Sequence, residues 1–158
     1  MATDIKWEAP TVTLTSLLTT TLNSLADDTT DDGGASAINN ETNLCTFMDL
    51  ELTLASLDLS AQTNPSVVIY LIESVDGGTD FDTYSDNVSA DASVPPADKI
   101  CAIFGLRLGT GSEAKTAVKS MIPIPPGRFK LLLRNKTGAA FAASGNVLAY
   151  RTYNLNTV

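Results

Sequence analysis

The chain contains no histidine among its 158 residues. This absence excludes the Ser-His and Cys-His pairs of nucleophilic catalysis and every metal site that needs a histidine ligand. General acid–base chemistry would therefore fall to carboxylates, Lys or Tyr. The Asp residues lie in predicted loops rather than at apolar strand ends, where burial could raise a carboxyl pKa. We expect a protein that is not an enzyme and that carries no cofactor.

Basic residues are scarce, with ten Lys and Arg against 18 Asp and Glu and a net charge of -8. Lys6 is the only basic residue among the first ninety. Nucleic acids and anionic membranes both attract clustered Lys and Arg, so this acidic chain predicts neither as a partner. The uneven distribution would let an acidic end of one copy meet a basic end of the next. A mixed, solvated surface is the simpler interpretation.

Long apolar runs are also missing. No stretch has the length of a transmembrane helix. Residues 1–7 have neither the basic nor the apolar region of a signal peptide, so we expect synthesis and folding in a cytoplasm. Cys45 and Cys101 are then expected to be buried free thiols. A disulfide between them is the alternative, and it would need their Cα atoms within about 7 Å.

Alternation of polar and apolar residues predicts β-strands along most of the chain. The clearest period of two lies at 44–54, where Met48, Leu50 and Leu52 share one face and Asp49 and Glu51 the other. A run that is apolar on both faces, as in a central strand, lies at 67–72. Other strands are predicted over 11–18, 99–108, 118–122, 129–133 and 145–153. A short helix over 113–119 is an alternative that we do not favour.

These seven to eight strands predict an all-β fold, an antiparallel β-sandwich of jelly-roll-like type. Residues 129–141 predict a strand, a polar Asn-Lys-Thr-Gly turn and a return leg before the last strand. The length favours one domain over residues 1–158, with a short N-terminal arm of about residues 1–10. The arm is the candidate interface, because a terminal segment can add a strand to a neighbour's sheet edge. Its candidate residues are Ile5, Trp7 and Pro10, and a core position is the alternative for Trp7.

Carboxylates gather in one segment, at Asp27, Asp28, Asp31 and Asp32. They are weak candidate metal ligands, because Ca²⁺ prefers carboxylate oxygens. The spacing departs from an EF-hand loop: with Asp28 at position one, position twelve is Asn39 rather than Glu. The default interpretation is an exposed, solubilising loop that buries nothing and binds no metal.

Several short motifs follow one another in a suggestive order. They are Asp4-Ile5-Lys6-Trp7, Leu22-Asn23-Ser24-Leu25-Ala26, Asn39-Asn40-Glu41-Thr42-Asn43, Ser74-Val75-Asp76-Gly77-Gly78-Thr79 and Arg134-Asn135-Lys136-Thr137-Gly138-Ala139-Ala140. In this order the chain resembles small virion structural proteins of tailed bacteriophages, of the kind that decorate or cement the capsid. The resemblance covers most of the chain. The acidic loop at Asp27 and the insertion of residues 80–97 depart from it.

The resemblance implies a β-sandwich that assembles on the outside of the phage head, often as a homotrimer. Its partners would be the major capsid protein and other copies of itself, and its location the capsid surface of the virion. No catalytic residues are implied. Two other hypotheses stay open: a tail or head-fibre module that binds host-surface glycans, and a hydrolase with two carboxylates at a cleft, one with a raised pKa.

Overall fold

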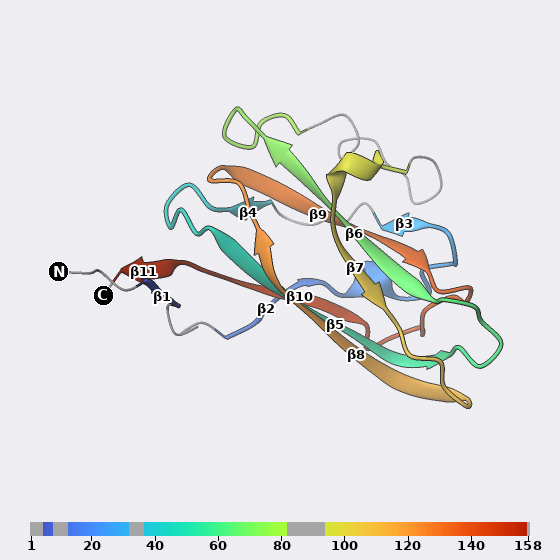
Figure 1. The fold of residues 1–158 in the computed structure, drawn as a ribbon. Coiled ribbons are helices and arrows are strands. Elements are labelled where there is room, and N and C mark those ends of the chain that lie inside the picture. Colours follow the sequence, from blue (N-terminus) through green and yellow to red (C-terminus); the bar gives the residue numbers. More distant parts are fainter. Residues whose placement is uncertain (1–4, 8–12, 32–36, 82–93, 158) are drawn as a thin grey trace.

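The computed structural model describes residues 5–7, 13–31, 37–81 and 94–157 (Figure 1). Only the backbone is described for 5–7 and 156–157. In chain order the elements are β1 (Ile5–Trp7), β2 (Thr15–Leu18), the 3-10 helix η1 (Thr20–Leu22), β3 (Thr30–Asp31), β4 (Ile38–Asn39), β5 (Phe47–Asp58), β6 (Ser66–Ser74), the 3-10 helix η2 (Ala97–Lys99), β7 (Ile100–Gly105), β8 (Ser112–Pro123), β9 (Arg128–Lys136), β10 (Val147–Tyr153) and β11 (Leu155–Thr157). The described residues contain no helix long and apolar enough to cross a membrane.

Two antiparallel sheets pack face to face, which confirms the predicted all-β sandwich (Figure 1). Sheet I has the strand order β2-β10-β5-β8. Sheet II has the order β3-β9-β6-β7, and β4 also pairs with β9. The two sheets thus hold nine strands rather than seven to eight. The difference comes from β3 and β4, whose two residues each are too short to carry a periodic signal.

The early and late parts of the chain pair with each other throughout. β1 pairs with β11, β2 with β10, β3 and β4 with β9, β5 with β8, and β6 with β7. Two further ladders, β5–β10 and β6–β9, complete the sheets. Every ladder in the described part of the chain therefore joins one of β1 to β6 to one of β7 to β11. This nested order is a property of the sandwich, and the jelly-roll-like type expected from the sequence stays a prediction.

The main core lies between the sheets and follows the predicted alternation. Met48, Leu50 and Leu52 of β5 are buried, and they pack in one cluster with Val67 and Ile69 of β6. Leu44, at the start of the predicted period of two, is 59% exposed and has a φ of 46°, so it precedes the strand and stays outside the core. The predicted strand over 11–18 begins only at Thr15, and residues 11–12 lie outside the described part.

A second, smaller apolar cluster covers the outer face of sheet II. Tyr70, Ile72 and Leu132 pack there with Phe81, which comes from the segment after β6. The Lys130 ammonium lies 4.3 Å from the centre of the Phe81 ring. This cover explains why β6 is apolar on both faces, and it confirms β6 as a central strand.

The segment turns back onto the sheet at Gly77 and Gly78, whose φ angles of 75° and 89° suit glycine.

The predicted hairpin between the last two long strands is wrong. β9 belongs to sheet II and β10 to sheet I, so the connection between them crosses from one sheet to the other. Asn135, expected in a turn, has no exposed surface and stays within β9. The predicted return leg at 139–141 is irregular, and its Phe141 N–H donates to the Leu25 carbonyl at 3.0 Å.

Candidate interaction surface

One side of the sandwich exposes the edges of both sheets. β8 ends sheet I and β7 ends sheet II, and the connection at 106–111 joins them. Within the described residues, neither strand has a partner on its outer side. We call this the β7–β8 side. Unpaired edges offer backbone N–H and C=O groups to another chain, so this side is the first place to look for a binding surface.

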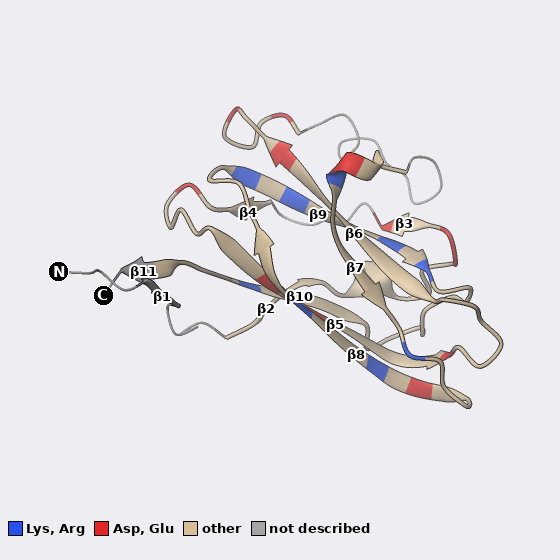
Figure 2. Ribbon diagram, in the orientation of Figure 1, with Lys and Arg blue, Asp and Glu red and all other residues tan. Residues whose placement is uncertain are grey.

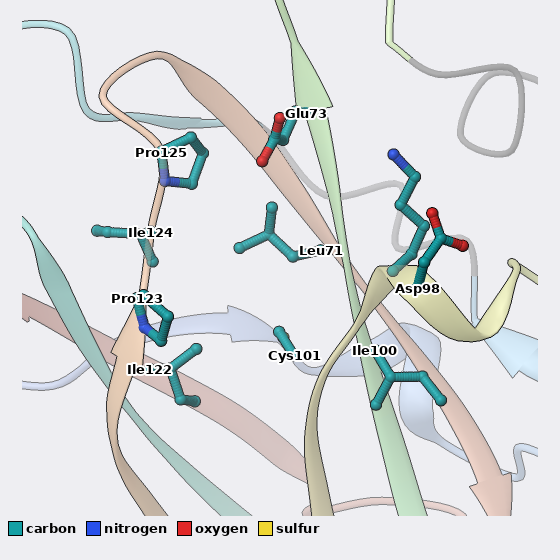
Figure 3. Close-up of a pocket in the computed structure, with 10 residues that line it drawn as sticks. Leu71, Glu73, Asp98, Ile100, Cys101, Ile122, Pro123, Ile124 and Pro125 are labelled. Carbon is teal, nitrogen blue, oxygen red and sulfur yellow. The ribbon is translucent and has the colours of Figure 1, made fainter.

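A cleft of about 450 Å³ opens at one end of this side, between β6, β7 and the end of β8 (Figure 3). Its walls are mostly apolar, and its charged groups come from the end of β6 and from η2. The lining residues are Leu71, Glu73, Asp98, Lys99, Ile100, Cys101, Ile122, Pro123, Ile124 and Pro125.

Cys101 contributes a thiol rather than a nucleophile to this cleft. Burial raises the pKa of the Cys101 thiol to about 12, so it stays protonated at neutral pH. Cys101 and Cys45 are both free and partly buried. The cleft therefore combines mostly apolar walls with a protonated thiol and a few charged groups at its rim.

A second hollow, of about 340 Å³, lies beside the other end of β8. It is bordered by Gly105, Leu106 and Arg107 on one side and by residues 114–117 on the other. The buried Lys115 ammonium donates a hydrogen bond to Glu113, and the Arg107 guanidinium lies 3.5 Å from the same carboxylate. The hydrogen bond from Lys115, together with the charges of Lys115 and Arg107, lowers the pKa of Glu113.

The free edge of β8 is interrupted at Met121, which has a φ of 61° and forms a bulge against β5. The Met121 N–H donates to the Asp49 carboxylate at 3.1 Å and to the Tyr153 hydroxyl at 3.2 Å. Arg151 donates two hydrogen bonds to the other oxygen of Asp49, at 2.9 and 2.7 Å. The bulge is thus held in place near the end of β8, and a second register shift in the same ladder lies between Leu54 and Leu57, opposite Lys115 and Glu113.

Asp49 was expected on a polar face and is buried instead. Burial opposes its ionisation, but hydrogen bonds from Arg151, Tyr153 and Met121 outweigh this effect and lower the pKa of Asp49. Its role is structural, because both carboxylate oxygens are occupied by donors of its own chain. The sequence signal for this pairing was weak, since Arg151 and Tyr153 lie about one hundred positions away.

Only part of the acidic segment forms the exposed loop that was predicted: Asp27 and Asp28 are exposed, and residues 32–34 lie outside the described part. Thr30 and Asp31 are buried in β3, opposite Arg134 and Leu133 of β9. The reason for the discrepancy is β9, which pairs with both β3 and β4 and so holds this polar segment in sheet II.

The candidate metal ligands point to separate partners. Asp27 accepts a hydrogen bond from the Gly138 N–H at 2.7 Å. Asp28 accepts from Lys136 at 2.8 Å and from Arg134 at 2.6 Å, and these bonds lower its pKa. Asp32 lies outside the described residues. Over the described ranges, no three Asp, Glu or Cys side chains are grouped so that they could hold a metal ion.

The candidate interface residues of the N-terminal arm are only partly described. Ile5 and Trp7 lie in β1, whose backbone pairs with Leu155–Thr157 of the same chain. Pro10 lies outside the described residues. The β1–β11 ribbon projects from one end of the sandwich, next to both chain termini (Figure 1). β1 therefore pairs within its own chain, and a role of these residues at an interface stays a prediction.

The β7–β8 side was missed in the sequence. β8 has charged or polar residues on both faces, which is typical of an edge strand, and this signal could have identified it. Lys and Arg lie largely on β8 and β9, whereas most Asp and Glu lie in connections and at strand ends (Figure 2).

Comparison of the chain with protein-family models, with curated proteins and with solved structures gave no match.

Proposed function

We propose that this protein is a structural virion protein that binds the outside of a bacteriophage head and stabilises the shell. The observation that carries the proposal is the nested strand order, because double-sheet jelly rolls recur in viral capsid domains and in lectins. A fold alone does not fix a function. The order of short motifs, which resembles that of capsid decoration proteins, favours the head role over others.

The state of the carboxyl groups supports a binding role over a hydrolase. Asp28, Asp49, Asp58, Asp76 and Glu113 all have a lowered pKa, in each case because hydrogen-bond donors or cations of the same chain stabilise the carboxylate. A glycosidase-type general acid needs the opposite shift, so that it is protonated at working pH. These five groups are therefore suited to holding the fold together and not to donating protons.

The proposed partners are the major capsid protein and other copies of this chain, assembled as a homotrimer on the shell. A protein that binds only the assembled shell stabilises that state by mass action. The β7–β8 side supplies apolar surface and free strand edges, which are features that a lattice-binding protein uses.

The test is co-sedimentation of the purified protein with empty capsids of its source, together with light scattering of the protein alone. We expect saturable binding to the shells and a higher temperature of shell disruption when the protein is bound. Protein that stays in the supernatant at all concentrations would contradict the head role.

A tail or head-fibre module that binds host glycans is the second candidate. A shallow hollow of about 290 Å³ combines carboxylates, a Lys and an aromatic ring, the types of group that bind sugars. It is lined by Glu73, Val75, Asp76, Asp80, Phe81 and Lys99. Glycan binding without shell binding would favour this candidate, and its readout would be a glycan array.

A further inference from the structure

The part of β8 that precedes Met121, residues 112–120, is a long free strand edge. Natural edge strands are usually short, or carry a bulge or a proline that prevents pairing. In β8 a bulge and a proline lie at the far end, at Met121 and Pro123, and a second register shift in the ladder with β5 lies opposite Glu113 and Lys115. Residues 112–120 pair with β5 on their inner side alone, within the described residues.

The sequence of this segment is complementary to itself in the antiparallel direction. When two copies are aligned about Thr116, Glu113 faces Lys119 of the other copy, and Ala114 faces Val118. Residues directly opposite in an antiparallel pair lie on the same face, so these side chains are in reach of each other. Lys119 is exposed, Val118 is 57% exposed, and the Glu113 side chain is 39% exposed.

The neighbouring registers lack this complementarity. Alignment about Ala117 would place Lys115 opposite Lys119, and like charges directly opposite each other are destabilising. Alignment about Lys115 would place Glu113 opposite Ala117 and Lys119 opposite Gly111, which removes both ion pairs. Among these three registers, the pattern of charges favours the one centred on Thr116.

We propose that two copies of this chain pair through β8 about a two-fold axis at Thr116, and that their two copies of sheet I become one continuous sheet. A second copy therefore occupies the free edge. The ion pairs between Glu113 and Lys119 form twice across the axis and stabilise this pairing. This contact is additional to the proposed function. A homotrimer on the shell would use another surface, and β8 would link copies in twos.

The connection at 106–111 lies beside the first part of this edge. The hollow of about 340 Å³ runs beside residues 114–117, the centre of the proposed pairing. A Cβ atom added at Gly105 or Gly111 would meet nothing within 4 Å, whereas one added at Gly109 would clash with the side chains of Glu113 and Lys115, so the connection packs against these two residues. The Arg107 side chain is 83% exposed next to this hollow and adds positive charge near Glu113.

Cysteine cross-linking tests both the pairing and its register. In the proposed dimer the two Thr116 Cα atoms lie about 4.5–5.5 Å apart, which is within disulfide range. The two Ser120 residues lie about 26 Å apart, at eight strand residues of about 3.3 Å each. We expect Thr116→Cys to oxidise to a covalent dimer at least tenfold faster than Ser120→Cys. Both variants retain Cys45 and Cys101, so the native thiols are controlled for.

Sedimentation of the charge variants tests the ion pairs. Lys119→Glu would place two carboxylates opposite each other on both sides of the axis, and we expect the dimer Kd to rise at least tenfold. Lys99→Glu changes the net charge equally but lies in η2, so it should leave the Kd within twofold of the unchanged chain. Circular dichroism verifies that both variants are folded, which is expected because Lys119 is exposed.

Equal cross-linking of the two cysteine variants, or none in either, would overturn the proposal. So would a chain that sediments as a monomer at every concentration, or a dimer unaffected by Lys119→Glu. A trimer in which Thr116→Cys does not cross-link would also overturn it, while leaving the shell-binding role untouched. All of these measurements use the free protein, so their failure is distinct from a failure to bind capsids.

Discussion

At the scale of single residues, Asn135 shows how strongly a buried amide can be tied into this fold. It has no exposed surface, and its side chain takes part in four hydrogen bonds. The amide nitrogen donates to the carbonyls of Leu25 and Ala139, at 3.0 and 2.8 Å, and the amide oxygen accepts twice from Thr137. Asn135 therefore connects β9 to two irregular segments at once.

We predict that Asn135→Ala lowers the free energy of unfolding by about 2–4 kcal/mol, because it leaves buried carbonyl and hydroxyl groups unsatisfied. Urea denaturation measures this change. Asn43→Ala is the matched control: Asn43 is exposed in a turn, and its removal should change the free energy by less than about 0.5 kcal/mol. Similar losses in the two variants would contradict the role of Asn135.

Asp49 predicts a pH dependence of stability. Its pKa in the folded chain is lowered below the ordinary value of 3.8, so the ionised form stabilises the fold. That contribution is complete above the pKa of the unfolded chain and is lost as the pH falls through the folded pKa. We expect Asp49→Asn to be less stable than the unchanged chain near neutral pH and to lose less stability between about pH 5 and about pH 2.

Unfolding midpoints at a series of pH values give this comparison. Asp98→Asn, at an exposed position in η2, is the control, and it should follow the unchanged chain over the whole series. If Asp49→Asn loses stability in acid as steeply as the unchanged chain, Asp49 does not carry the effect.

Asp49 and its neighbours in β5 also show how much the sequence could predict. The alternation in β5 correctly placed Met48, Leu50 and Leu52 in the core. It placed Asp49 in solvent, because the side chains that cover and neutralise Asp49 come from β10, about one hundred residues later. A periodic pattern reports which face a residue occupies and not what covers that face.

At the scale of elements, the two apolar clusters differ in how they are attached. Phe129 lies in the main core with no exposed surface, whereas Phe81 joins the smaller cluster on the outer face of sheet II. Segments with few buried contacts open locally without unfolding the rest of the chain.

We predict that Phe129→Ala costs about 3–5 kcal/mol of unfolding free energy, the usual range for a fully buried Phe. Phe81→Ala should cost less and act locally. Hydrogen exchange would show faster exchange confined to residues 75–81 and the neighbouring part of β9. Exchange that rises equally in β5 would mean that the outer cluster is not a separate unit.

The elements themselves were mostly visible in the sequence. β8 forms a strand although residues 113–119 have reasonable helix propensity, because pairing with β5 overrides local preference. The sequence predicted β9 correctly, but it predicted wrongly that a hairpin joins β9 to β10. A turn-like sequence does not reveal that the next strand belongs to the opposite sheet.

At the scale of the whole molecule, the nested ladders divide the chain into two complementary parts. Residues 1–81 carry 13 acidic residues and one Lys, a net charge of -12. Residues 94–158 carry nine basic and two acidic residues, a net charge of +7. The uneven charge noted in the sequence thus becomes a set of ion pairs between the two parts, as in Arg134 with Asp28 and Arg151 with Asp49. The mixed surface that the sequence favoured arises from this interleaving.

We predict that separate fragments of residues 1–81 and 94–158 lack stable sheets alone and form them when mixed, because every described ladder needs a strand from each fragment. Far-UV circular dichroism of each fragment and of the mixture measures this. The rate of association should fall as salt is added, since the fragments carry opposite charges. A folded fragment on its own would contradict the prediction.

The nested ladders have a further consequence during synthesis. A ribosome releases β1 to β6 before any of their partners exist, so the nascent chain has no native sheet to form during that time. The net negative charge of this early portion repels other nascent copies of it and repels nucleic acid. Folding must wait for β7 to β11, and a transcript that stops early yields no partly functional domain.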